Sequence, residues 1–206
     1  MDNIKEFADE LDKRMWKTKG SRYNKYRRYK RKHQLSLSTI SILTLYVFII
    51  TLADYYPVIK LSESQKELIP FLSIILSISI LILSLLEASK NYQIKSERLY
   101  NCANEITNLY IELRQSICSE PQKQDEMLSE ITKRYKTILE KYAENHDPID
   151  YEMFQAEHSK HFSVGRIKKS SIFLKAIILS YWLYLILICL PPVAFYLFVI
   201  KDIIIK

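Results

Sequence analysis

The chain has 206 residues, a formal net charge of +7 and a mean hydropathy of -0.07, and it contains only 2 glycines. A Rossmann-type phosphate loop and a P-loop each need two or more glycines close together. Gly20 and Gly165 are too far apart to form either motif, and no GxSxG sequence is present. The composition favours long helices and argues against the common NTPase and hydrolase classes. No catalytic residue and no cofactor is predicted.

Residues 1–34 are predicted to form a cytosolic amphipathic and basic segment. Apolar side chains recur there at spacings of three or four residues, which is typical of one face of a helix: Ile4, Phe7, Leu11 and Met15. A basic run follows directly before the first apolar run, where membrane proteins place their cytosolic anchor. The residues predicted to form this basic anchor are Arg27, Arg28, Lys30, Arg31 and Lys32.

Two apolar runs predict a transmembrane hairpin over residues 35–86. The runs cover about residues 35–53 and 68–86, each close to the roughly 20 residues that a helix needs to cross a bilayer. The link 60–67 between them is short and polar. A third run, about 176–200, lies in the predicted C-terminal segment 171–206, where Pro191 and Pro192 allow either a spanning helix with a kink or a re-entrant segment. The predicted fold is an all-α membrane protein.

Residues 87–170 are predicted to form a cytosolic helical region. Two apolar stripes indicate helices that each bury one face: Leu99, Cys102, Ile106, Leu109, Leu113 and Ile117, then Leu128, Ile131, Tyr135, Ile138 and Tyr142. A polar break over 119–126 predicts a loop between them, and 145–170 reads as irregular. The stripes fit a helical hairpin, or one helix continuing the second membrane helix with another packed against it. They also fit coiled-coil self-association.

The distribution of Lys and Arg predicts the orientation. These residues are dense before the first apolar run and after the second, but the link 60–67 contains only Lys60 and Lys66. The positive-inside rule therefore places the N-terminus and residues 87–170 in the cytosol.

Hydroxyl side chains occur in both runs of the predicted hairpin. By their spacing, Ser73, Ser77 and Ser84 share one face of the second run, and the first run carries Ser41, Thr44 and Thr51. Small polar residues let membrane helices approach closely and form hydrogen bonds. The same faces can line a water-filled path in an oligomer, and the two roles are compatible if the packing builds a pore.

The region 145–161 holds the chain's one cluster of side chains that resemble metal ligands: His146, Asp150, His158 and His161. His158 and His161 have no third histidine at motif spacing, so no metal site is predicted. Asn145 and Asp147 have the side chains that begin or end helices. We interpret Asn145, His146, Asp150 and Tyr151 as a helix boundary that is also a cytosolic contact site for a regulator.

The layout resembles the SLATT family of bacterial two-transmembrane effector domains over about residues 1–162. The resemblance is carried by the Trp16 helix, the basic run, the Ser-rich apolar helices, the junction 86–92, residues 99–109, and residues 135–139 leading to 144–151. The third apolar run goes beyond a two-helix description.

The resemblance implies a pore-forming or membrane-depolarising effector of anti-phage (abortive infection) systems in the bacterial inner membrane. Such an effector is expected to form homo-oligomers in the lipid bilayer. It would be held silent by a neighbouring nucleotide-synthase or reverse-transcriptase (retron) complex with nucleic acid. The family offers no catalytic residue to carry over. A passive membrane scaffold, and an enzyme acting on lipid through the His146–His161 region, remain alternatives.

Overall fold

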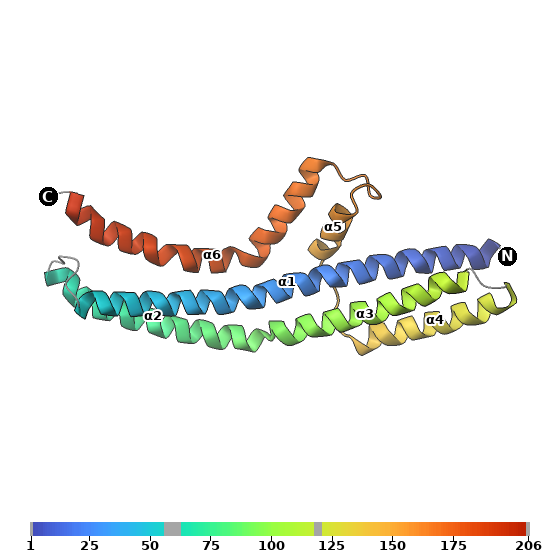
Figure 1. The fold of residues 1–206 in the computed structure, drawn as a ribbon, viewed down its shortest axis with the longest axis horizontal. Helices are drawn as coiled ribbons and strands as arrows, with labels where there is room; N and C mark the ends of the chain where they lie inside the picture. Colours follow the sequence, from blue (N-terminus) through green and yellow to red (C-terminus); the bar gives the residue numbers. More distant parts are fainter. Residues whose placement is uncertain (1, 56–62, 118–120, 205–206) are drawn as a thin grey trace. The chain divides into compact units, whose positions relative to one another are not determined.

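The computed structural model of the chain describes residues 2–55, 63–117 and 121–204. In this part of the chain the elements are helices, with no strand: α1 (Asp2–Tyr55), α2 (Glu63–Lys90), α3 (Tyr92–Ile117), α4 (Pro121–Lys141), α5 (Pro148–Glu157) and α6 (Arg166–Ile204) (Figure 1). The predicted all-α fold is therefore confirmed. Part of the predicted outer link falls on residues 56–62, outside the described residues.

The helices divide between two compact units. Unit 1 contains residues 1–31 and 92–178, and unit 2 contains residues 32–91 and 179–206. Helix α1 contributes to both units without a break, because the basic run joins the amphipathic segment and the first apolar run in one helix. Helix α6 likewise begins in unit 1 and ends in unit 2.

The core of unit 1 forms where α1 packs against α3 and α4 (Figure 1). Its buried residues include Leu11 and Met15 from α1, together with most of the two predicted stripes: Cys102, Ile106, Leu109, Leu113, Leu128, Ile131 and Tyr135. The prediction of buried helix faces is confirmed there. It was wrong for Phe7, which is 47% exposed, because Ala8 takes the buried position one residue later.

Two other parts of unit 1 differ from the prediction. The polar stretch 119–126 was predicted as a loop. Residues 119 and 120 lie outside the described residues, but from Pro121 onward the stretch forms the start of α4, because proline is well tolerated in the first turn of a helix. The stretch 145–170 was predicted as irregular, but it contains α5 and the start of α6. Their apolar residues Ile149, Ala156, Ile172 and Ala176 bury one another in a second, smaller core.

Three helices are long and apolar enough to cross a membrane. Their most apolar windows have mean hydropathies of 2.1, 2.7 and 2.2, in α1, in α2 and in α6. Only 6% of the second window is buried within the chain. Apolar surface of this extent is strongly unfavourable in water. The chain is therefore a membrane protein whose spans need lipid or another copy as their surroundings.

Polar contacts connect α6 with the other helices of unit 2. The Tyr184 hydroxyl is buried and donates a hydrogen bond to Oε2 of Glu87 at 2.7 Å. The hydroxyl of Tyr46 in α1 donates to the backbone carbonyl of Ile188 at 3.3 Å. Helix α6 runs through Pro191 and Pro192. Because Pro192 has no N–H, the carbonyl of Ile188 four residues earlier loses its usual helical donor, and Tyr46 replaces it.

The replacement predicts a specific double-mutant cycle. Tyr46→Phe should lower the free energy of unfolding by about 0.5–1.5 kcal/mol, the usual contribution of one hydrogen bond. In a Pro192→Ala background the backbone N–H of residue 192 can again donate to the carbonyl of Ile188. The loss of unfolding free energy caused by Tyr46→Phe should then be clearly smaller. Denaturant unfolding of the full chain in detergent measures both, with Tyr196→Phe, an exposed tyrosine of α6, as the control. Equal costs in the two backgrounds would contradict the assignment.

Candidate functional site

The segment of residues 145–162, which we call the docked segment, lies within unit 1 against the part of α1 that belongs to this unit. Its helix α5 begins at Pro148, with Asp147 as the N-cap residue. The backbone N–H of Asp147 donates to Oδ2 of Asp150 at 2.9 Å, which is the return bond of a capping box. The prediction that Asp147 begins a helix is therefore confirmed.

An ionic cluster holds the start of α5 on α1. The guanidinium of Arg28 donates from Nε and Nη2 to the two carboxylate oxygens of Asp150, at 2.9 and 3.0 Å, and also to Asp147. Lys25 donates to Oδ1 of Asp147 at 3.1 Å and to the carbonyl of Asn145 at 2.6 Å. The amide of Asn24 donates to the backbone carbonyl of Asp150 at 3.1 Å. The cluster thus holds the backbone at Asn145 and Asp150 as well as the carboxylates of Asp147 and Asp150.

Burial makes this cluster energetically important. Asp150 is 0% exposed, and the side chain of Arg28 is 11% exposed. Burial alone would lower the pKa of Arg28, but hydrogen bonds and charge interactions with Asp150 and Asp147 raise it. Burial alone would raise the pKa of Asp147, but its bonds to Arg28 and Lys25 lower it. Each charge is therefore stabilised by its partner, and removing one partner leaves a buried charge unpaired.

The five residues of the predicted basic anchor have different surroundings in the structure. Arg28 pairs with the docked segment, and Arg27 pairs with Glu157 at 2.7 Å. Lys30 donates to the hydroxyl of Tyr26 at 3.2 Å, and Arg31 is exposed, while Lys32 belongs to unit 2. The sequence interpretation assigned the whole run to a membrane anchor, and it missed the structural roles of Lys25 and Asn24.

The predicted contact residues occupy different positions around this cluster. Asp150 lies within it, and Asn145 contributes its carbonyl. His146 is half-buried and lines a groove beside the cluster. Tyr151 is half-buried and packs on the ring of Phe154 at 6.3 Å between centroids. One signal was present in the sequence: Lys25 and Arg28 are three residues apart, as are Asp147 and Asp150, so each pair shares a helix face.

An aromatic cluster forms the other half of the docking contact. The ring of Trp16 lies edge to face with Phe154, His158 and His161, at centroid distances of 4.8, 4.9 and 4.9 Å. It also stacks on Phe162 at 5.8 Å. The two histidines weighed as metal ligands therefore surround an indole ring. No group of three metal-ligating side chains occurs among the residues that the structure describes.

Gly20 permits this close contact. A Cβ atom at position 20 would lie 2.2 Å from two ring atoms of Phe154. That distance is far inside van der Waals contact, so a side chain at position 20 is incompatible with the observed packing. A Cβ atom at Gly165 would meet nothing within 4 Å. The two glycines of the chain therefore have different structural roles.

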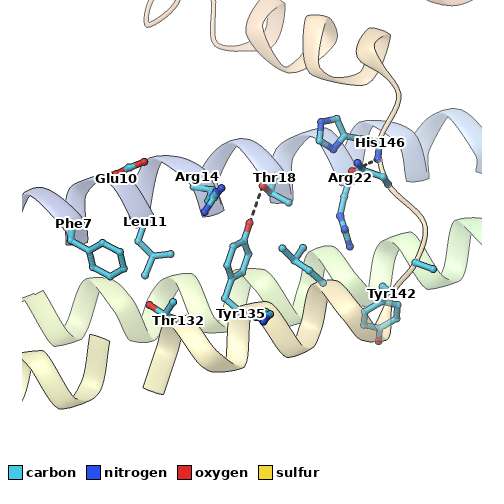
Figure 2. A pocket seen from close by; sticks show the side chains of 14 residues that line it. Phe7, Glu10, Leu11, Arg14, Thr18, Arg22, Thr132, Tyr135, Tyr142 and His146 are labelled. Atoms are coloured by element: carbon cyan, nitrogen blue, oxygen red, sulfur yellow. Dashed lines mark hydrogen bonds between the residues drawn. The ribbon is translucent and has the colours of Figure 1, made fainter. Parts of the chain in front are cut away.

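A groove of about 790 Å³ opens beside the docked segment, between α1 and α4 (Figure 2). Its walls include Arg14 and Arg22 of α1, and His146 at the start of the docked segment. Tyr135 of α4 crosses it, and its hydroxyl donates to Thr18 at 3.0 Å (Figure 2). Burial is the main reason that the pKa of His146 is lowered; Arg22 and Lys25 add to this effect, whereas Asp150 and Asp147 oppose it.

The membrane hydroxyls lie apart from this site, in unit 2. Four are exposed and two are half-buried: Ser41, Thr44, Thr51 and Ser77, then Ser73 and Ser84. All except Ser73 donate to the carbonyl four residues earlier in their own helix, at 2.7 to 3.0 Å. The Ser73 hydroxyl is buried without a hydrogen-bond partner. Satisfied hydroxyls tolerate either lipid or water, so their role stays a prediction.

The glycine contact predicts the outcome of a matched pair of substitutions. Gly20→Ala should displace Phe154 and release α5 from α1, whereas Gly165→Ala should leave the docking unchanged. We expect Gly20→Ala to lower the free energy of unfolding by about 1–3 kcal/mol, the usual cost of overpacking. Limited proteolysis of the docked segment and denaturant unfolding measure the effect. Equal behaviour of the two variants would contradict the packing.

The comparisons place the chain among known proteins. Residues 4–198 match the SMODS and SLOG-associating 2TM effector domain family 5, a SLATT family, and the match extends over both units and most of α6. The searches of curated proteins and of solved structures found no match. The resemblance noted in the sequence is thereby confirmed: the chain belongs to the SLATT family and is a membrane effector domain of nucleotide-signalling or defence systems.

Proposed function

We propose that the chain is a pore-forming or membrane-depolarising effector of a bacterial anti-phage (abortive infection) system. It acts in the inner membrane with its N-terminus in the cytosol, as the distribution of Lys and Arg indicates. The observation that carries the proposal is the continuity of α1. Its first part holds the docked segment through Arg28, and its second part is the first apolar span, so a regulator acting on the docked segment has a covalent route to the membrane.

Two states are needed for such an effector. In the silent state, the docked segment stays bound to the Arg28 face of α1. A cytosolic regulator that prefers the released state shifts the population toward it. The family is described as SMODS- and SLOG-associating, so the proposed regulator is a partner encoded nearby. A reverse-transcriptase (retron) complex with nucleic acid, or a nucleotide synthase, is the kind of regulator that the resemblance implies.

A homo-oligomer is the proposed conducting form. Each copy provides three apolar helices, too few to surround a water-filled path with helices on every side. Large exposed apolar surface on α2, including Ile74, Leu81 and Leu85, is available for packing against other copies. The serine face of α2 permits close approach, because Ser73, Ser77 and Ser84 are small.

A non-conducting scaffold is the second candidate, and one observation favours it. The exposed hydroxyls of α1 and α2 bond to their own helices, so they do not require water. In this alternative, the apolar helices only anchor the cytosolic unit and its partner. The scaffold predicts no ion flux and no toxicity.

Membrane potential in living bacteria separates the two candidates. The chain is expressed alone, with its genomic neighbours, and under phage challenge, in cells carrying a potential-sensitive dye. We expect depolarisation in at least one condition, and its loss in Ser73→Leu, Ser77→Leu, Ser84→Leu, because leucines on this face block a close helix contact or a polar path.

The control for this experiment is another serine of α2. Ser77 and Ser79 are both exposed, and each bonds to the carbonyl four residues earlier, at 2.7 and 2.8 Å. They lie on opposite sides of the helix, about 200° apart. Ser79→Leu should keep the activity that Ser77→Leu weakens. If the triple variant inserts into the membrane and still depolarises it, the serine face is not needed for the activity. If no condition gives depolarisation, the scaffold is favoured.

A further inference from the structure

The groove beside the docked segment contains a buried cation, Arg22, that no carboxylate of the described residues contacts within ion-pair distance. Arg22 is 4% exposed, and its Nη1 donates to Sγ of Cys102, a weak acceptor. Its Nε atom is buried and has no hydrogen-bond partner. Among the described residues no carboxylate forms an ion pair with Arg22. Buried guanidinium groups are normally paired, so this one has unused capacity to bind an anion.

Glu144 is a carboxylate whose charge interacts with Arg22, but it is paired elsewhere. Burial raises the pKa of Glu144, while its hydrogen bond to Arg98 and the charges of Arg98 and Arg22 lower it overall. Its Oε1 atom already accepts from Nη1 of Arg98 at 3.1 Å. Glu144 is thus bonded to Arg98 through Oε1, whereas its Oε2 atom and the Nε of Arg22 are both buried without a hydrogen-bond partner.

Other positive side chains line the same groove. Arg14 lies two turns before Arg22 on α1, and Lys136 lies on α4 across the groove. Glu10 is the acidic residue of the lining, so the charged side chains there sum to a positive charge. Apolar surface from Leu11 and Leu139 completes the walls. A groove of about 790 Å³ is within the usual range for small-molecule sites, roughly 300–1,000 Å³.

We propose that this groove binds a small phosphate-bearing ligand, whose oxygens are contacted by Arg22, Arg14 and Lys136. Three cations suit a ligand with two or more negative charges better than a single carboxylate, and guanidinium groups match phosphate oxygens in geometry. The apolar walls accommodate an uncharged part of the ligand. His146 and Asn145 also line the groove, so an occupant touches the first residues of the docked segment. Its regulatory meaning rests on the proposed function; the binding itself does not.

Calorimetric titration of the detergent-purified full chain tests the proposal. The probes are inorganic pyrophosphate, ATP and glycerol 3-phosphate, which separate phosphate alone, a nucleotide and a lipid headgroup. We expect saturable binding of at least one probe, and the tightest one identifies the source of the phosphate. Arg22→Met should weaken its Kd by about tenfold or more, as expected for one lost charge-assisted contact. Circular dichroism checks that this variant is folded.

A charge-matched pair of variants tests the site even if the buried Arg22 cannot be replaced without unfolding the protein. Arg14→Gln, Lys136→Gln removes two cations that line the groove, and Lys13→Gln, Lys133→Gln removes two exposed cations of the same helices that do not. The first should weaken the Kd by about tenfold or more and the second by less than about twofold. Equal weakening would show general attraction to a basic surface and overturn the site. Absence of binding by all three probes would overturn it as well, whatever the chain does to the membrane potential.

Discussion

The bidentate contact between Arg28 and Asp150 is the interaction on which the position of the docked segment in unit 1 depends. Asp150 is buried and Arg28 is mostly covered, and their pairing brings the start of α5 onto α1. That position sets where Phe154 meets Gly20 and where His146 lines the groove. Because a buried charge without its partner is costly by about 3–5 kcal/mol, removing either side chain should loosen the start of α5 from α1.

Unit 2, which contains the apolar parts of α1, α2 and α6, follows a different physical constraint. In hydrocarbon every backbone polar group needs a partner inside the protein. The proline pair in α6 breaks this rule within its own helix, and Tyr46 of α1 compensates at Ile188. Tyr184 and Glu87 form a second polar contact between α6 and α2. These contacts connect the third apolar helix to the hairpin, although the family is described as having two transmembrane helices.

Much of this architecture follows from local pattern. Apolar spacing predicted the buried faces of α1, α3 and α4, and run length predicted the three apolar helices. The exception at Phe7 and Ala8 shows that spacing locates a face only to within one residue. Family membership was also readable from the arrangement of charged and apolar segments.

The docking contact could not be predicted in the same way. It joins residues more than a hundred positions apart in the sequence. The basic run could also bind anionic lipid, so its charge alone does not indicate a partner within the chain. The complementary spacing of Lys25 and Arg28 with Asp147 and Asp150 becomes meaningful only when the two helices are known to meet. The need for glycine at position 20 depends on the position of Phe154, and the unpaired Nε of Arg22 depends on the packing around Cys102.

Amide hydrogen exchange across the full chain in lipid nanodiscs tests the central claim, that Arg28 holds α5 on α1. Arg28→Met is compared with the wild type and with Arg31→Met, which removes an exposed cation from the same helix. We predict that α5 exchanges at least about tenfold faster in Arg28→Met alone, while α3 and α4 keep their protection. If α5 stays protected in Arg28→Met, or if both variants lose protection equally, the ionic cluster does not hold the docked segment.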